Sequence, residues 1–148
     1  MLKSKPLLAL LSQPLSSTIE FACLFTATGS LLSHAPSSSR KGHTYAALAS
    51  SIWNDYQKLG VSGVLSAALQ KDEKAEQLNW VCVDLQNGKI FIQRTVDIPN
   101  ADEGEGQTES LIVALVGNQD AALGMMKSKV DAISEYLATS IQTKKLEL

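Results

Sequence analysis

This sequence has no large excess of positive or negative charge. Its 148 residues include 13 Lys or Arg and 15 Asp or Glu, so the formal net charge is -2. The basic residues form no stripe or cluster along the chain. Binding to nucleic acid depends on neutralising phosphates with such clusters, so the composition argues against a nucleic-acid partner.

Cysteine and long apolar runs are also scarce. The two cysteines, Cys23 and Cys82, lie in apolar segments and are too few for a disulfide framework or a zinc site, so we expect reduced core thiols. No apolar run reaches the ~20 residues of a membrane span. The apolar start ends at Ser12, which predicts a short helix with Pro6 in its first turn rather than a signal peptide. We expect a protein of the cytosol or of a cytosolic membrane face.

Motifs that carry chemistry are missing as well. The sequence holds no Gly-rich phosphate loop, no His-Glu-x-x-His and no Cys-x-x-Cys. His34 and His43 flank a polar loop without a further ligand at metal-binding spacing. Ser37 to Ser39 lie beside two basic residues. They are interpreted either as phosphorylation sites or as ordinary loop residues. We therefore expect no catalytic residue, no cofactor and no metal, and a non-enzymatic interaction protein.

What the sequence does contain is a central amphipathic helix, predicted from Thr44 to Leu59 with Gly60 as its C-terminal cap. We expect its bulky face to pack on the protein's own sheet. The opposite face is small and uncharged, which either reflects the high helix propensity of alanine or lets a partner approach closely. The bulky face comprises Tyr45, Leu48, Ala49, Ile52, Trp53, Tyr56 and Leu59, and the small face Ala46, Ala47, Ser50, Ser51 and Asn54.

Strands are predicted on both sides of this helix. Ile19 to Thr26 is apolar on both faces, as in a sheet covered from two sides, and is followed by a returning strand at Ser30 to Ser33. Leu78 to Leu85 and Lys89 to Thr95 flank Asn87-Gly88, a strong hairpin signal. Leu111 to Val116 is an unbroken apolar run, typical of a buried strand.

The remaining segments complete the plan. Asp97 to Glu109 carries five carboxylates and no basic residue, which predicts a flexible acidic loop. A helix is expected from about Gln119 to Ile141. The segment from Val61 to Gln77 gives no clear pattern. Residues 1–148 are thus expected to form a single domain of the α+β class, with helices on both faces of an antiparallel sheet.

Several segments resemble the roadblock/LC7 domain family, and more narrowly the roadblock subunits of Ragulator (LAMTOR) scaffolds that pair with a MAPK-scaffold subunit. They are the opening MLKSKPLLALLSQ, GSLL at Gly29 to Leu32, AALASSIWNDY in the central helix, and GMMKSKVDAISEYL near the end. The resemblance covers nearly the whole chain. It implies a five-stranded antiparallel sheet with the central helix on one face and the terminal helices on the other.

The resemblance also implies a heterodimer with a second roadblock subunit, in which central helices pack together and edge strands pair. Further implied partners are a lipid-anchored wrapping subunit and Rag-type GTPases, on the late endosomal, lysosomal or vacuolar surface in signalling to the TOR kinase complex. The membrane is reached only through partners. The residues implied at the partner interface are Ala46, Ala49, Ser50, Trp53, Gln57, Asn79, Val81 and Val83.

Two other readings stay open. One is a homodimeric roadblock protein that serves a dynein motor or a small GTPase directly. The other is a small-molecule sensor, which predicts a hollow lined by Trp53, Tyr56 and Trp80.

Overall fold

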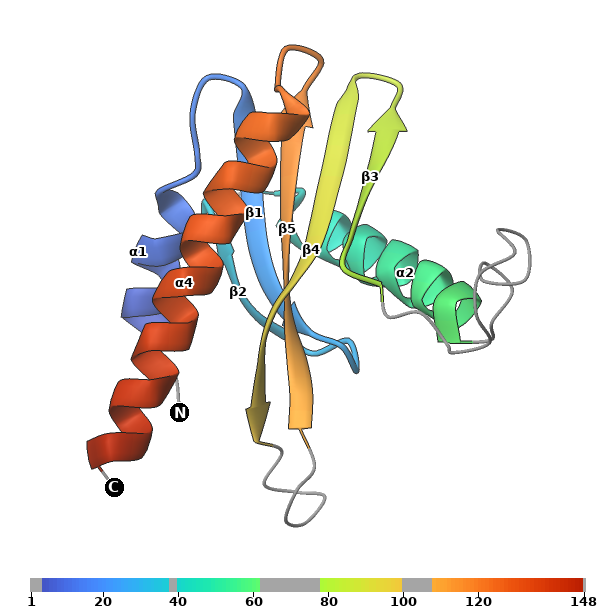
Figure 1. Ribbon diagram of the computed structural model, residues 1–148. Coiled ribbons are helices and arrows are strands. Elements are labelled where there is room, and N and C mark those ends of the chain that lie inside the picture. Colours follow the sequence, from blue (N-terminus) through green and yellow to red (C-terminus); the bar gives the residue numbers. More distant parts are fainter. Residues whose placement is uncertain (1–3, 38–39, 62–77, 100–107, 148) are drawn as a thin grey trace.

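The computed structural model describes residues 4–37, 40–61, 78–99 and 108–147. The expected order of helices and strands and the α+β class are confirmed (Figure 1). The expected segment 61–77 lies outside the described residues except at its first position. The elements are α1 (Ser4–Ser12), β1 (Ile19–Thr26), β2 (Leu31–Ala35), α2 (Gly42–Val61), β3 (Trp80–Leu85), β4 (Gly88–Pro99), β5 (Thr108–Asn118) and α4 (Leu123–Glu147).

The strands form one five-stranded sheet in the order β2-β1-β5-β4-β3. Every neighbouring pair is antiparallel. The two strands with the longest apolar runs, β1 and β5, lie side by side near the middle, where both of their faces are covered. The shorter strands β2 and β3 therefore form the two edges.

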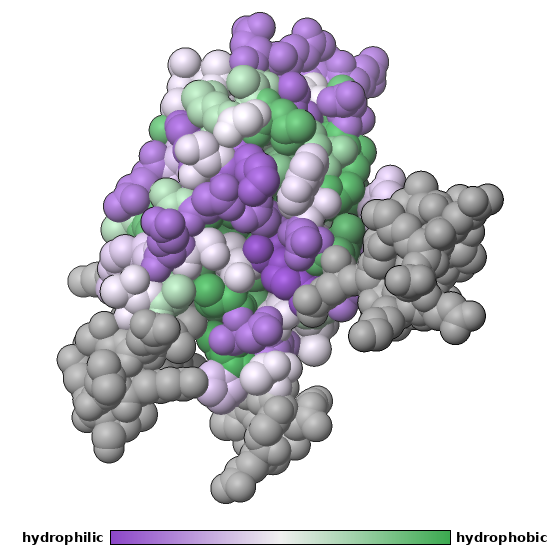
Figure 2. Space-filling view, viewed as in Figure 1, coloured by the Kyte–Doolittle hydropathy of each residue, from purple (hydrophilic) through white to green (hydrophobic). Residues whose placement is uncertain are grey.

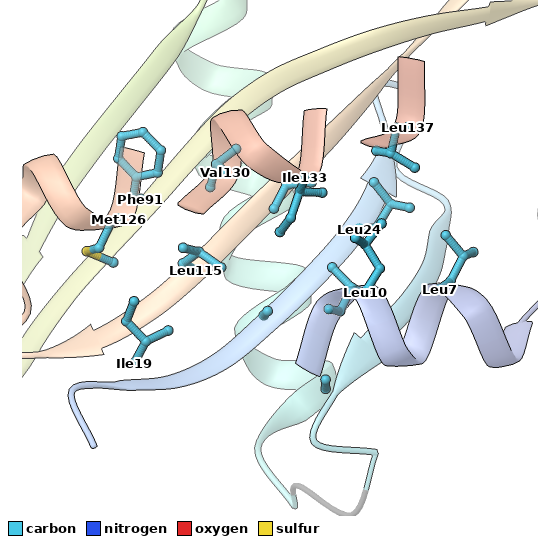
Figure 3. Packing of buried hydrophobic residues seen from close by; sticks show 14 of the residues in the cluster. Leu7, Leu10, Ile19, Leu24, Phe91, Leu115, Met126, Val130, Ile133 and Leu137 are labelled. Carbon is cyan, nitrogen blue, oxygen red and sulfur yellow. The ribbon is translucent and has the colours of Figure 1, made fainter. Parts of the chain in front are cut away.

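Helices α1 and α4 cover one face of this sheet (Figure 3). Leu7, Leu10 and Leu11 of α1 are buried, as the predicted amphipathic start requires. On α4 the buried residues recur every three or four positions and meet Leu24 and Leu115 of the sheet. These residues of α4 are Met126, Val130, Ile133 and Leu137.

Helix α2 covers the other face (Figure 1). There Phe21, Cys23 and Phe25 of β1 meet the helix, while Ala22 and Leu24 face α1 and α4. This split confirms the expected alternation along β1. It also confirms that the central helix and the terminal helices lie on opposite faces.

The β3–β4 hairpin has the expected strands but a different turn. Leu85 pairs with Gly88, so the turn residues are Gln86 and Asn87 and the glycine begins β4. A Cβ on Gly88 would lie 2.2 Å from the carbonyl oxygen of Gly117 on β5. Gly88 is therefore required by the close approach of a neighbouring strand, and not by the turn.

The predicted ends of the central helix and of the acidic loop are wrong. Gly60 lies inside α2, which continues to Val61. The ends of the predicted acidic loop belong to the sheet, since Asp97 pairs with Ser110 and Ile98 with Glu109. Pairing between strands overrides the local acidic composition there. Residues 100–107 of the loop lie outside the described residues, so its predicted flexibility stays a prediction. Leu123 continues the three-and-four spacing of the buried residues of α4 but is 38% exposed.

Candidate partner-binding surface

Helix α2 meets the sheet with a narrower stripe than its sequence predicts. The centre of the contact is Ala46, Ala49 and Trp53, with exposed fractions of 7%, 0% and 1%. The alanines let the helix lie close to the strands, and Trp53 fills the space beyond them. The resemblance implies these three residues at a partner interface. The sheet of their own chain already buries them, so they have almost no surface left to contact a partner.

The bulky residues expected on the sheet lie at the side of this stripe. Leu48, Tyr56 and Leu59 are 39%, 41% and 41% exposed, so their predicted packing on the sheet is wrong. Ile52 is partly buried beside the core. Apolar residues recur at three-and-four spacing on two adjacent sides of α2, and sequence periodicity does not say which side meets the sheet. We call Leu48, Ile52, Tyr56 and Leu59 the apolar flank.

The opposite side of α2 lines a groove of ≈ 750 Å³ against the β1–β2 turn. Gly29 in this turn has φ 102°, and a Cβ there would lie 3.6 Å from the Ser50 hydroxyl. Trp53, Tyr56 and Trp80 do not line this groove, so it is not the hollow predicted for a small-molecule sensor. The lining residues are Phe25, Ala27, Thr28, Gly29, Leu31, His43, Ala46, Ala47, Ser50, Ser51 and Asn54.

The edge strand β3 supplies the remaining predicted interface residues. Val81 and Val83 are partly buried and pair with Ile92 and Ile90, which face α2. Asn79, just before β3, is exposed, and its carbonyl accepts a 2.9 Å bond from the backbone N–H of Arg94. Within the described sheet the outer side of β3 has no neighbouring strand. An edge strand with valines and no neighbour presents unpaired backbone groups, a template for pairing with another chain.

Exposed aromatic surface also lies on the other side of β3. Trp80 is 41% exposed and packs against Phe91 with ring centroids 5.6 Å apart. Figure 2 shows this side of the molecule, where hydrophilic residues follow α4 and hydrophobic ones lie beside it toward β3. Ser50 and Gln57, the last two predicted interface residues, are partly buried on α2. The structure thus brings the predicted residues to two elements, but most of the exposed apolar area lies elsewhere on them.

The titratable groups of the core are not arranged for chemistry. Burial raises the pKa of Cys23 to about 12, so this thiol is neutral at physiological pH. Burial also raises the pKa of Cys82, on the opposite face of the sheet. His34 stacks on Phe21, and its ring centroid lies 5.6 Å from that of His43. No group of three or more His, Cys, Asp or Glu side chains able to hold a metal occurs among the described residues.

One cation of the α2 face was missed by the sequence analysis. The guanidinium carbon of Arg94 lies 5.9 Å from the centroid of the Trp53 ring, between β4 and α2. The signal that could have indicated it is the alternation along β4, which puts Arg94 on the same face as Ile90 and Ile92. None of the helices in the described ranges combines the length and the apolar character needed to cross a bilayer.

Comparison with known proteins places the fold. No family model matches the sequence. An uncharacterized protein of Schizosaccharomyces pombe is 25% identical over 160 residues, covering 97% of both chains. Among solved structures, a roadblock/LC7 domain from Streptomyces avermitilis has a TM-score of 0.64 at 15% identity, covering 91% of this chain and 97% of that one.

Two further structures agree. MglB of Myxococcus xanthus has a TM-score of 0.60 at 11% identity, covering 93% of this chain and 96% of that one. A structure of MglB with a tetrameric arrangement has a TM-score of 0.58 at 19% identity, with coverages of 94% and 90%. The chain therefore has the roadblock/LC7 fold, as its sequence resemblance implies.

Proposed function

We propose that this chain is a non-catalytic subunit of a roadblock-type assembly. It pairs with a second roadblock domain through the apolar flank of α2 and the edge strand β3. The observation that carries the proposal is the exposure of Leu48, Tyr56 and Leu59 on the helix whose hydrophobic cluster also includes Val81 of this edge strand. Exposed apolar surface next to an open sheet edge is a poor end state for a monomer.

The finer form of the proposal rests on the sequence resemblance. It makes the chain the roadblock subunit of a Ragulator-type scaffold, paired with a MAPK-scaffold-type subunit and held by a lipid-anchored wrapping subunit. The assembly recruits Rag-type GTPases for signalling to the TOR kinase complex. Its place is the cytoplasmic face of the late endosome, lysosome or vacuole, reached through its partners. The shared fold with roadblock/LC7 domains and MglB supports the family.

A homodimer is the second candidate. One of the similar structures is of MglB with a tetrameric arrangement, which supports self-assembly as the alternative. Mass in solution separates the two candidates. A chain that forms a stable pair alone and ignores a MAPK-scaffold-type subunit is homodimeric, and one that pairs only with that subunit is the scaffold component.

The pairing surface is tested by matched charge insertions. Tyr56→Glu places a charge in the apolar flank, and burying it without a partner should weaken pairing by about 2 kcal/mol or more. Tyr136→Glu is the control, because Tyr136 is 51% exposed on α4 on the opposite face. Ser50→Glu separates the two sides of α2, since the sequence interpretation expects it to abolish pairing. Analytical ultracentrifugation measures all three.

The outcomes are distinct. Loss of pairing with Tyr56→Glu alone assigns the contact to the apolar flank. Loss with Ser50→Glu alone assigns it to the groove side of α2. Pairing that survives both substitutions shows that α2 is not at the interface.

A further inference from the structure

Arg94 is held in an unusual environment for a cation. It follows two buried isoleucine positions that face α2, so its side chain extends along the underside of that helix. Its Nε is buried and has no hydrogen-bond partner. Burial lowers the pKa of Arg94, and the charge of Asp97 offsets this in part. The ring of Trp53 supplies one stabilising contact, a cation–π interaction.

The carboxylates near this end of the sheet are already engaged. Asp97 accepts a 2.6 Å hydrogen bond from the Ser110 hydroxyl, and Glu109 accepts one from Thr28. Among the described residues no carboxylate lies within ion-pair distance of Arg94. Arg94 is partly buried, and withdrawing its Nε from water without a counter-ion is costly because the protein interior solvates charge poorly.

Trp53, which lies against Arg94, is a second buried donor without an acceptor. Its side chain is 1% exposed, and its indole Nε1 has no hydrogen-bond acceptor. Two neighbouring donors, one of them charged, thus lack acceptors between α2 and β4. Just beyond Arg94 the pairing of β4 with β5 shifts register before Asp97. Such bulges often redirect a side chain beside a functional site.

We propose that Arg94, lying on Trp53, receives the carboxylate of an Asp or Glu side chain from the paired subunit. This inference rests on the proposed function, because the pairing surface brings the partner to this place. The backbone N–H of Arg94 donates a hydrogen bond to the carbonyl of Asn79, just before the edge strand, so Arg94 stands on the strand that pairs with this edge. A guanidinium and a carboxylate match in charge and in planar geometry, which favours this ligand over a neutral one.

The test compares two properties of the same variants. In the pair, whether with a second copy or with the co-expressed subunit, Arg94→Met should raise the dissociation constant at least about tenfold. Arg94→Lys should recover part of the lost affinity, since lysine keeps the positive charge but lacks the planar guanidinium that binds a carboxylate through two N–H groups. Arg40→Met is the matched control, because Arg40 is an exposed arginine just before α2. Sedimentation at several salt concentrations should show a weaker salt dependence for Arg94→Met than for the unchanged pair.

Thermal unfolding at a dilution where the pair has dissociated gives the second readout. There Arg94→Met should leave the melting temperature unchanged or raise it, because it removes a desolvated charge. A lower melting temperature would show that Arg94 serves the fold of its own chain, and would overturn the proposal. Unchanged pairing of Arg94→Met would overturn it as well while leaving the roadblock pairing intact. A chain that never pairs would instead refute the proposed function.

Discussion

At the scale of single residues, one polar contact fixes α4 on the sheet. Gln93 of β4 is 7% exposed, and its side-chain amide donates a 2.7 Å hydrogen bond to Asp131 of α4. Lys127 lies 3.1 Å from the other oxygen of the same carboxylate. The hydrogen bond from Gln93, and then the lysine, lower the pKa of Asp131. The contact joins β4 to the first half of α4.

Asp131→Ala should lower the free energy of unfolding by about 1 kcal/mol at neutral pH, because it leaves the buried amide of Gln93 without its acceptor. A lowered carboxyl pKa stabilises the fold above its unfolded value, and this contribution disappears as the pH falls through the folded value. The difference between the two proteins should therefore begin to shrink as the pH falls to the ordinary pKa of 3.8, and it should vanish only below the lowered pKa of the folded protein.

Urea unfolding over a pH series measures this difference. Glu135→Ala serves as the control, since this carboxylate lies exposed on the same helix. Equal effects of the two substitutions would show that the bond to Gln93 contributes nothing.

At the scale of elements, the β3–β4 hairpin depends on a glycine that has no room for a side chain. Gly88→Ala would force a Cβ against the backbone of Gly117, and backbone cannot move aside as a side chain can. We expect a loss of about 3 kcal/mol in the free energy of unfolding. Gly124→Ala is the matched control, because a Cβ there meets nothing within 4 Å at the start of α4.

Alanine at Gly124 should leave stability unchanged or raise it by about 0.5 kcal/mol. The urea midpoints of the two variants measure these changes in stability. If Gly88→Ala unfolds at the same urea concentration as the unchanged chain, the hairpin tolerates a shift that the structure does not indicate.

Elements were also the scale at which the sequence was most informative. Ile19 to Thr26 was predicted with the bounds that β1 has, because a strand apolar on both faces leaves few alternatives. The orientation of α2 was not predictable in the same way. Ala46 and Trp53 share one side with Ala49, while Leu48 and Tyr56 offer a second apolar side, and only the shape of the sheet selects between them.

Arg94 marks a second limit of sequence reasoning. A lone cation in a strand is ordinarily an exposed residue, and its burial follows from the helix that crosses it. Trp53 was predicted to pack on the sheet, as it does, and the resemblance also implied it as a partner contact; its cation–π contact with Arg94 was not predicted. The candidate surface could be located on α2 and β3 from the sequence, but its exposed residues could not.

At the scale of the whole molecule, the two cysteines report on two different events. Cys23 is fully buried in the α2 layer with a pKa of about 12, so it should react with a thiol reagent only on global unfolding. Cys82 lies partly buried on the edge strand and should react faster in the folded chain. Its raised pKa means that the rate increases as the pH rises toward that value.

Pairing along β3 should slow the modification of Cys82 and leave that of Cys23 limited by unfolding. Mass spectrometry of the labelled chain against protein concentration measures both rates, with Cys82→Ser to assign them. A Cys82 rate independent of concentration, in a sample known to be paired, would place the partner away from this strand.

The arrangement of the termini has a practical result. Helix α1 begins and α4 ends on the same side of the molecule, on the layer opposite α2 (Figure 1). A fluorescent reporter or a tether attached at either end would project from that layer and leave α2 facing outward. The chain can be immobilised by its ends while its opposite face stays open to whatever it meets.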